Sequence, residues 1–166
     1  MKAFGAIAAA LLALALAGCA SQQAMHVNPG AVTNPVAKYK NAIAVRTVSG
    51  GQVMNVLTVP GVADEPFKAA LESSLAANGY LAKTGAPKYY LDAEIKNLDQ
   101  PLIGLDLEVV STVTYKVSGA GAPASFPITA KGMATFSDSP IAVDRIRIAN
   151  ERAMQDNIRQ FLVALR

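Results

Sequence analysis

Residues that support most enzyme chemistry are scarce in this chain of 166 residues, which has one cysteine, one histidine and no tryptophan. A single cysteine excludes an intramolecular disulfide. The only histidine, His26, precedes the segment that we expect to fold, so we expect no Ser-His or Cys-His pair on the folded domain. Zinc sites are built mainly from these two residue types. The sequence therefore predicts no enzyme, no metal and no cofactor.

Charge is also sparse, because Asp, Glu, Lys and Arg make up only 16% of the chain and the formal net charge is +3. Proteins that bind nucleic acid usually carry a strongly basic surface. We therefore expect no nucleic-acid partner. The sequence also lacks phosphate-binding loops and the motifs of serine hydrolases and zinc proteases, in agreement with the expectation that it is not an enzyme.

No apolar run is long enough to cross a bilayer, which takes roughly 20 residues in a helix. The longest uncharged apolar run is residues 3–17, which follows Lys2 and precedes small residues. A cationic start, a short apolar stretch and small residues are typical of a signal peptide. We interpret residues 1–18 as a signal peptide.

The cysteine lies directly behind this run. Leu16-Ala17-Gly18-Cys19 resembles the bacterial lipobox, in which a leucine and two small residues precede a cysteine. The resemblance implies a diacylglyceryl group on the Cys19 thiol, cleavage after Gly18 and acylation of the new amino terminus. A thiolate is the side-chain nucleophile best suited to that transfer. The alternative is a secreted protein with a stray cysteine.

The residues after Cys19 predict the destination and the domain organisation. In such lipoproteins an Asp after the cysteine indicates retention in the inner membrane, whereas Ala20 and Ser21 follow here. We therefore expect a lipid anchor in the periplasmic face of the outer membrane. Two Asn-Pro pairs, which disfavour helix, lie in the residues that follow. We expect residues 19–40 to be a flexible lipidated tether and residues 41–166 a single periplasmic domain.

Hydrophobic periodicity predicts an α+β fold for that domain. We expect an antiparallel sheet with two helices packed on one face, in the order β-α-β-β-β-α. The expected strands are residues 42–48, 89–98, 105–117 and 126–136, with a bend or bulge near Ser111 and with Phe136 on the covered side. The expected helices are residues 64–78, ended by Gly79, and a C-terminal helix that begins at Pro140 or later, near Asn150.

Carboxylates alternate along the second and third of these strands, where Asp92 and Glu94 share one face, as do Asp106 and Glu108. Paired carboxylates can serve hydrolysis. The simpler interpretation is the solvated face of a half-covered sheet. A carboxylate-based hydrolase is therefore our third hypothesis.

Arginines recur every seven residues near the C-terminus, and seven residues are close to two helical turns. The first interpretation is a strip that binds lipid phosphates, an anionic polymer or an acidic partner. The second is a solvated face whose arginines pair with Asp144, Glu151 and Asp156. The candidate anion- or partner-binding residues are Arg145, Arg147, Arg152, Arg159 and Arg166.

A second candidate surface precedes the first helix. Residues 53–62 are unusually apolar for a connector. They form either a strand in the core or an exposed docking patch. The candidate docking residues are Val53, Met54, Val56, Leu57 and Val59.

The lipobox, the stretch NVLTVPGVADEPFKAALESSLAANGYL (residues 55–81) and the arginine-rich terminal helix resemble small periplasmic lipoproteins of the YajG kind. The chain also resembles the auxiliary lipoproteins of envelope ABC transporters. These resemblances imply a non-enzymatic accessory protein that binds an envelope protein partner or helps to assemble or transport an envelope component. The alternative is a carrier or sensor of an anionic amphiphile.

Overall fold

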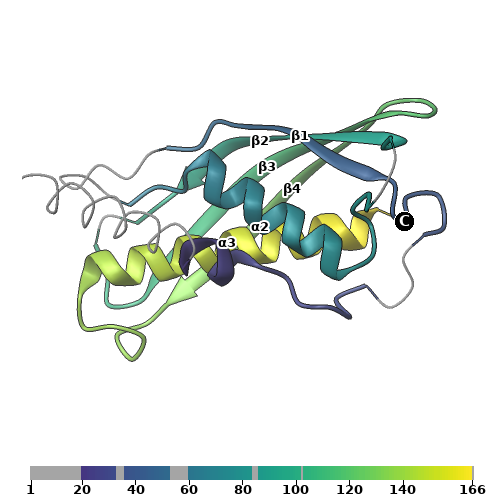
Figure 1. Cartoon of the computed structure of the whole chain (residues 1–166). Coiled ribbons are helices and arrows are strands. Elements are labelled where there is room, and N and C mark those ends of the chain that lie inside the picture. The colour runs from purple at the N-terminus through teal and green to yellow at the C-terminus, as the bar shows by residue number, and fades with distance from the viewer. Residues whose placement is uncertain (1–19, 33–35, 53–59, 84–85, 102, 166) are drawn as a thin grey trace, which may run out of the picture.

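The strands and helices follow one another along the chain in the predicted order, β-α-β-β-β-α (Figure 1). The computed structural model describes residues 20–32, 36–52, 60–83, 86–101 and 103–165. Its elements are strands β1 (Ile43–Ser49), β2 (Tyr89–Asp99), β3 (Leu107–Gly119) and β4 (Ala124–Ala134), and helices α2 (Asp64–Ala77) and α3 (Ala142–Ala164). Residues 20–25 are also helical.

Several predictions concern residues outside this description. They are the signal peptide, the lipidation of Cys19, the role of Arg166, and the docking patch of Val53, Met54, Val56, Leu57 and Val59.

One sheet of four strands forms a layer, and α2 and α3 cover one of its faces (Figure 1). The α+β class and the packing of helices against the sheet are confirmed. The fully antiparallel sheet is wrong for one strand pair, because β1 and β2 are parallel whereas β2, β3 and β4 are antiparallel. The physical reason is the connection: α2 lies between β1 and β2 in the chain, and a helical crossover returns the chain to the edge where the first strand began.

Helix α2 ends as its sequence predicts. Gly79 has a φ of +76°, which is strained for residues with a Cβ atom. Tyr80 N donates to Leu75 O at 2.8 Å, and Gly79 N donates to Ala76 O at 3.2 Å. These two bonds satisfy carbonyls of the last turn and reverse the chain toward β1.

Helix α3 begins at Ala142, earlier than Asn150 and two residues after Pro140. The apolar residues that recur along one face of this helix from Met154 onward do not continue upstream, where Arg147 and Glu151 take that face, and the sequence therefore also allowed a late start. In the structure these two residues are one helical turn apart and form an ion pair, with Arg147 Nη1 3.0 Å from Glu151 Oε2. The two charged residues that interrupt the apolar face therefore form an ion pair within the helix, and the helix continues through them.

The bend or bulge expected near Ser111 in the third strand lies on the neighbouring strand instead. Strand β3 pairs with β4 without interruption, whereas the register between β2 and β3 shifts at β2 between Ile95 and Asn97. The irregularity lies close to Ser111 in the sheet but on the neighbouring strand. An extra residue on one strand is the usual way in which a long antiparallel pair absorbs its twist.

Helix α3 approaches β4 so closely that only glycine fits at one position. A Cβ atom on Gly132 would lie 2.2 Å from both Ala149 O and Ala153 N. Nearby, Asn157 is fully buried and accepts a hydrogen bond from Tyr115 Oη at 2.9 Å while it donates to Ser111 Oγ at 3.1 Å. Tyr115 also stacks on Phe161, with ring centroids 4.0 Å apart. These contacts fix how α3 lies on the sheet.

The residues expected to form a flexible tether differ from that expectation. Met25, Val27 and Tyr39 are buried and belong to the main hydrophobic core. Val27 N donates to Ser74 Oγ of α2 at 2.9 Å, and Gln155 Nε2 of α3 donates to His26 O at 2.6 Å. Residues 20–32 therefore lie against both helices, because their apolar side chains and backbone groups find partners there.

Candidate functional site

The predicted arginine strip lies on a single continuous helix. Because α3 spans Ala142–Ala164, it carries Arg145, Arg152 and Arg159 at intervals of seven residues. Their environments differ, however. Arg145 is 5% exposed, whereas the side chains of Arg152 and Arg159 are about half exposed. The strip is therefore not one uniform cationic surface.

Arg145 holds three loop segments together. Its Nη1 donates to Ser139 O at 2.8 Å, and its Nη2 donates to Gly104 O at 3.4 Å. Its guanidinium carbon lies 5.6 Å from the centre of the Phe136 ring. The buried cation thus joins the loop before β3, the loop after β4 and the start of α3.

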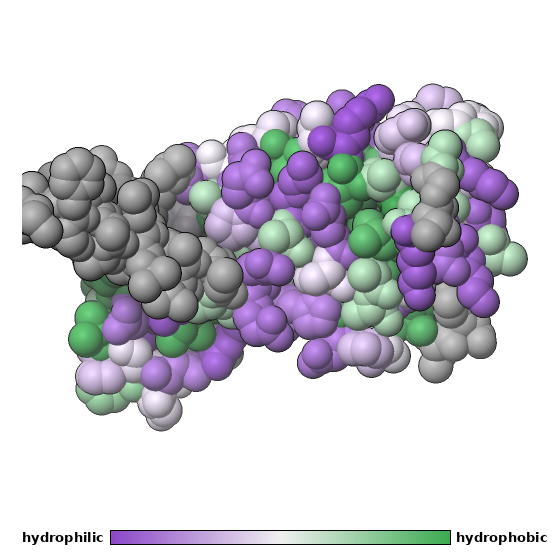
Figure 2. Space-filling model, in the orientation of Figure 1, coloured by the Kyte–Doolittle hydropathy of each residue, from purple (hydrophilic) through white to green (hydrophobic). Residues whose placement is uncertain are grey.

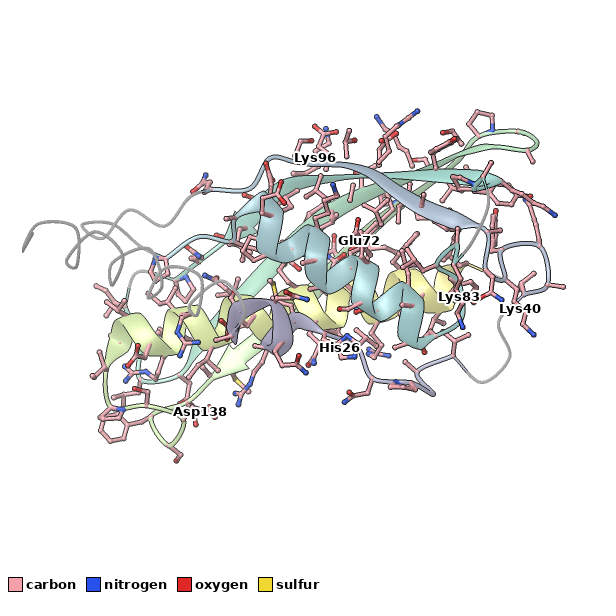
Figure 3. The ribbon with its side chains drawn as sticks, in the orientation of Figure 1. His26, Lys40, Glu72, Lys83, Lys96 and Asp138 are labelled. Carbon is pink, nitrogen blue, oxygen red and sulfur yellow. The ribbon has the colours of Figure 1, made fainter. Side chains whose placement is uncertain are left out.

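The other described arginines of α3 are paired with carboxylates. Arg152 Nη2 lies 2.7 Å from Asp138 Oδ1, and Arg159 Nε donates to Asp156 Oδ1 at 2.9 Å. The hydrogen bond from Arg152 is the main cause that lowers the pKa of Asp138 well below its usual range. Arg147 pairs with Glu151 as described above. The predicted pairing at helical spacing is found for two of them, whereas Arg152 reaches into the loop before α3, where Asp138 lies (Figure 3).

The carboxylates on the uncovered sheet face are also paired. Arg46 and Thr47 donate to Asp92, and Lys96 lies 2.5 Å from Glu94. The hydrogen bonds from Arg46 and Lys96 are the main causes that lower the pKa values of Asp92 and Glu94, respectively. A general acid in hydrolysis needs a raised pKa. The geometry therefore favours a solvated face. The third strand's Glu108 is paired similarly, with Lys131 at 2.9 Å.

The structure brings together one pair that sequence reasoning excluded. His26 Nδ1 lies 3.0 Å from Ser73 Oγ of α2, so a Ser-His contact does form on the folded domain (Figure 3). The expectation was wrong because the segment that carries His26 packs on the helices. The Ser73 hydroxyl donates to Ala70 O at 3.0 Å. Because Ala70 O can only accept, this carbonyl competes with the imidazole for the single hydroxyl proton, whereas nucleophile activation requires that proton to be directed at the base.

The first described residues lie in a groove beside α3. Ala20 and Ser21 line a cavity of about 290 Å³ together with Gly61, Val62, Arg147, Asn150 and Glu151. A second cavity, of about 330 Å³, is lined by Val27, Asn28, Pro29, Ala31, Gln155, Asp156 and Arg159. Both lie where residues 20–32 meet the body of the domain. Both are close to the smallest size that holds a small organic ligand.

Large apolar side chains gather where α3 begins, and sequence reasoning missed this cluster. Ile103 is 93% exposed, Leu105 73%, Phe136 57%, Ile141 58% and Val143 56%. We call these five residues the apolar end; Figure 2 shows strongly hydrophobic residues at this end of the molecule. Phe136 was expected on the covered side of its strand. That expectation was wrong because β4 ends at Ala134, and a turn in which Asp138 N donates to Thr135 O follows.

Within the described residues, the arrangement of potential metal ligands and the hydropathy of the helices bear on chemistry and membrane insertion. No group of three or more His, Cys, Asp or Glu residues is arranged to hold a metal ion in this part of the chain. None of the helices among the same residues has the length and hydropathy needed to cross a membrane.

Comparison with known proteins yields likeness of fold and no family. No family model and no curated protein matches the sequence. A solved hypothetical protein from Chlamydia trachomatis is 12% identical with a TM-score of 0.50, and the match covers 75% of this chain and 94% of that one. It shows a shared fold alone.

Two further solved structures resemble the chain less closely in TM-score. One is a "putative lipoprotein" from Caulobacter crescentus, 14% identical with a TM-score of 0.47, for which 75% of this chain and 88% of that chain are covered. The other is a Xanthomonas campestris protein of family-model DUF330, 10% identical with a TM-score of 0.48, for which 82% and 91% are covered.

Proposed function

We propose that this protein is a lipid-anchored, non-enzymatic accessory protein of the cell envelope. Its domain is held at the periplasmic face of the outer membrane, where it binds an envelope protein or helps to assemble or transport an envelope component. The observation that carries the proposal is an adjacency. Ala20, which directly follows the lipobox cysteine, already lies in a groove of the folded domain.

That adjacency supports a specific way for an anchored domain to meet the membrane. Two or more acyl chains anchor a protein stably, because each buried methylene contributes about 0.8 kcal/mol. Residues 20–32 are held by Met25 in the core and by the hydrogen bond from Gln155 to His26. An anchor on Cys19 would therefore keep the domain at the bilayer surface, rather than at the end of a long flexible tether.

The non-enzymatic part of the proposal is supported by the way in which reactive groups are used. The carboxylates of the open sheet face are paired with cations, and the Ser73 hydroxyl lies 3.0 Å from a helix carbonyl, Ala70 O, which competes with His26 for its proton. These groups stabilise the fold and are not arranged as an acid, a base or a nucleophile.

Metabolic labelling with palmitate tests the anchor. The wild-type protein is expected to incorporate label and the Cys19→Ala variant to lose it, whereas Ser21→Ala, which leaves the cysteine in place, should keep it. Label that persists in Cys19→Ala would contradict the proposal.

Membrane fractionation tests the destination. The mature protein is expected in the outer-membrane fraction, and Ala20→Asp should move it to the inner membrane while palmitate labelling is unchanged. Ala20 is exposed, so the substitution leaves the packing of the domain intact. A wild-type protein found in the inner-membrane fraction would overturn this part of the proposal.

Crosslinking in intact cells, followed by mass spectrometry, tests the accessory role. An envelope protein captured by the wild type and lost in Cys19→Ala is the expected result. The amphiphile-carrier alternative predicts a different outcome: an envelope lipid would be extracted in stoichiometric amount from the purified protein. The cavity beside Arg159 is the place where such a lipid would bind.

A further inference from the structure

We propose that the apolar end of the domain (Ile103, Leu105, Phe136, Ile141 and Val143) inserts into the bilayer that holds the lipid anchor. This inference rests on the proposed function, because it takes the anchor on Cys19 as given. It adds the face of the domain that contacts the membrane and the kind of force that holds it there.

The exposure of these side chains is unusual for loops. Loops at a protein surface are normally rich in polar residues. Here the loop before β3 presents Ile103 and Leu105, the turn after β4 presents Phe136, and the start of α3 presents Ile141 and Val143. Three segments that are far apart in the sequence thus contribute to one apolar surface, which indicates an interaction site.

The apolar end is held in place before it meets a partner. Arg145 is buried beneath it and donates to Ser139 O and Gly104 O, while its guanidinium lies against the Phe136 ring. Each of the three segments is therefore attached to the same side chain. A surface that is already ordered loses little conformational entropy when it binds.

The position of the chain's first described residues selects the bilayer as the occupant. Ala20 and Ser21 share a groove with Arg147. Val143 lies one helical turn before Arg147, so it lies on the same side of α3. The lipobox cysteine precedes Ala20 directly, so its lipid would enter the membrane beside the apolar end. The β3–β4 hairpin tip lies at the other end of the molecule (Figure 1).

The charges around the apolar end indicate insertion of apolar side chains rather than attraction to anionic headgroups. Arg147 is paired with Glu151 and Arg152 with Asp138. Asp144 adds a further carboxylate in the first turn of α3. We therefore expect contact with zwitterionic vesicles, little affected by salt, whereas a binding strip of arginines would require anionic lipid.

The test uses the mature lipid-anchored protein with one added cysteine that carries an environment-sensitive fluorophore. The probe site is Ile103→Cys, and the control is Ala122→Cys in the exposed hairpin tip. Each protein is reconstituted into phosphatidylcholine vesicles that contain a lipid with a quencher on its acyl chain. The probe at 103 is expected to lose most of its fluorescence and the probe at 122 almost none, with or without added phosphatidylglycerol.

A second variant guards against insertion driven by the fluorophore itself. Leu105→Asp in the Ile103→Cys background places a charge beside the probe and is expected to abolish the quenching while the anchor stays intact. Quenching that survives this change, or that requires phosphatidylglycerol, would overturn the inference. So would an unquenched probe at 103.

The unmodified protein separates failure of the inference from failure of the anchor. A Cys19 sulfur that carries diacylglycerol cannot react with a maleimide, so the wild-type mature protein should show no reactive thiol. If it shows one, the proposed anchor is wrong. If it shows none and the probe at 103 stays unquenched, the anchor stands and only the contact of the apolar end is wrong.

Discussion

The sheet-facing side of α3 and the apolar end at its start are built from similar residue types but use them differently. Where α3 crosses the sheet, Gly132 admits the helix backbone and Asn157 satisfies the buried hydroxyl of Tyr115. At the apolar end, Ile103 and Leu105 contact mostly solvent. The difference teaches that apolar residues in this chain serve two purposes: the first group stabilises the fold, and the second is available for an external surface. Substitutions in the two regions should separate stability from membrane contact.

The largest effect is expected from Gly132→Ala. The added Cβ atom would collide with backbone atoms of α3 that cannot rotate away. Overpacking of this kind costs about 3 kcal/mol of unfolding free energy. Urea denaturation measures it, and Lys131→Ala on the same strand is the control, because an exposed ion pair contributes at most about 1 kcal/mol. Equal midpoints for the two variants would contradict the close approach of α3.

The next effect is expected from Asn157→Leu, which leaves the buried Tyr115 hydroxyl without its acceptor. An unsatisfied buried polar group costs about 1–3 kcal/mol. Tyr115→Phe in the same chain removes the other partner, so the double variant should be less destabilised than the sum of the two single variants. Additive losses in a thermal or urea cycle would show that the two side chains are not coupled.

A smaller, pH-dependent effect is expected from Asp138→Asn. The Arg152 guanidinium holds the pKa of Asp138 below its value in the unfolded chain. The carboxylate therefore stabilises the fold fully above the unfolded pKa of about 4, and this contribution is lost as the pH falls below it. Urea midpoints should differ between wild type and variant at neutral pH and converge in acid. The exposed Asp99→Asn is the control, and a difference independent of pH would refute the assignment.

The smallest effect on stability is expected from Ile103→Ser combined with Leu105→Ser. Because both side chains are already exposed, the unfolding free energy should change by less than about 0.5 kcal/mol. With the fluorophore moved to Ile141→Cys, another exposed residue of the apolar end, its quenching by the acyl-chain quencher should nevertheless be lost. A stability loss as large as that of Asn157→Leu would place these residues in the core and erase the contrast between the two regions.

Periodicity alone determined most of the fold. Alternation along residues 89–98 predicted β2, and the Pro66 and Gly79 signals bounded α2 to within a residue. These features depend on neighbours in sequence, which explains why they could be read without coordinates. The parallel pairing of β1 with β2 could not be predicted from the sequence, because alternation specifies which face of a strand is buried and not the direction of its partner strand.

The features of the candidate site also divide into those that depend on nearby residues in the sequence and those that depend on tertiary contacts. The seven-residue recurrence of arginines was evident in the sequence, and so was the pairing of Arg159 with Asp156 at helical spacing. The burial of Arg145 and the pairing of Arg152 with Asp138 depend on loops that fold back from elsewhere in the chain. No local signal predicts them.

The sequence by itself determined the α+β class, the bounds of most elements and the lipobox pattern at Cys19, because each depends on residues within a few positions of one another. Only the tertiary structure decided that Met25 belongs to the core, that His26 meets Ser73, and that Ile103, Phe136 and Val143 form one exposed surface. Those outcomes depend on which segments meet in space, and long-range packing, rather than local preference, sets that choice.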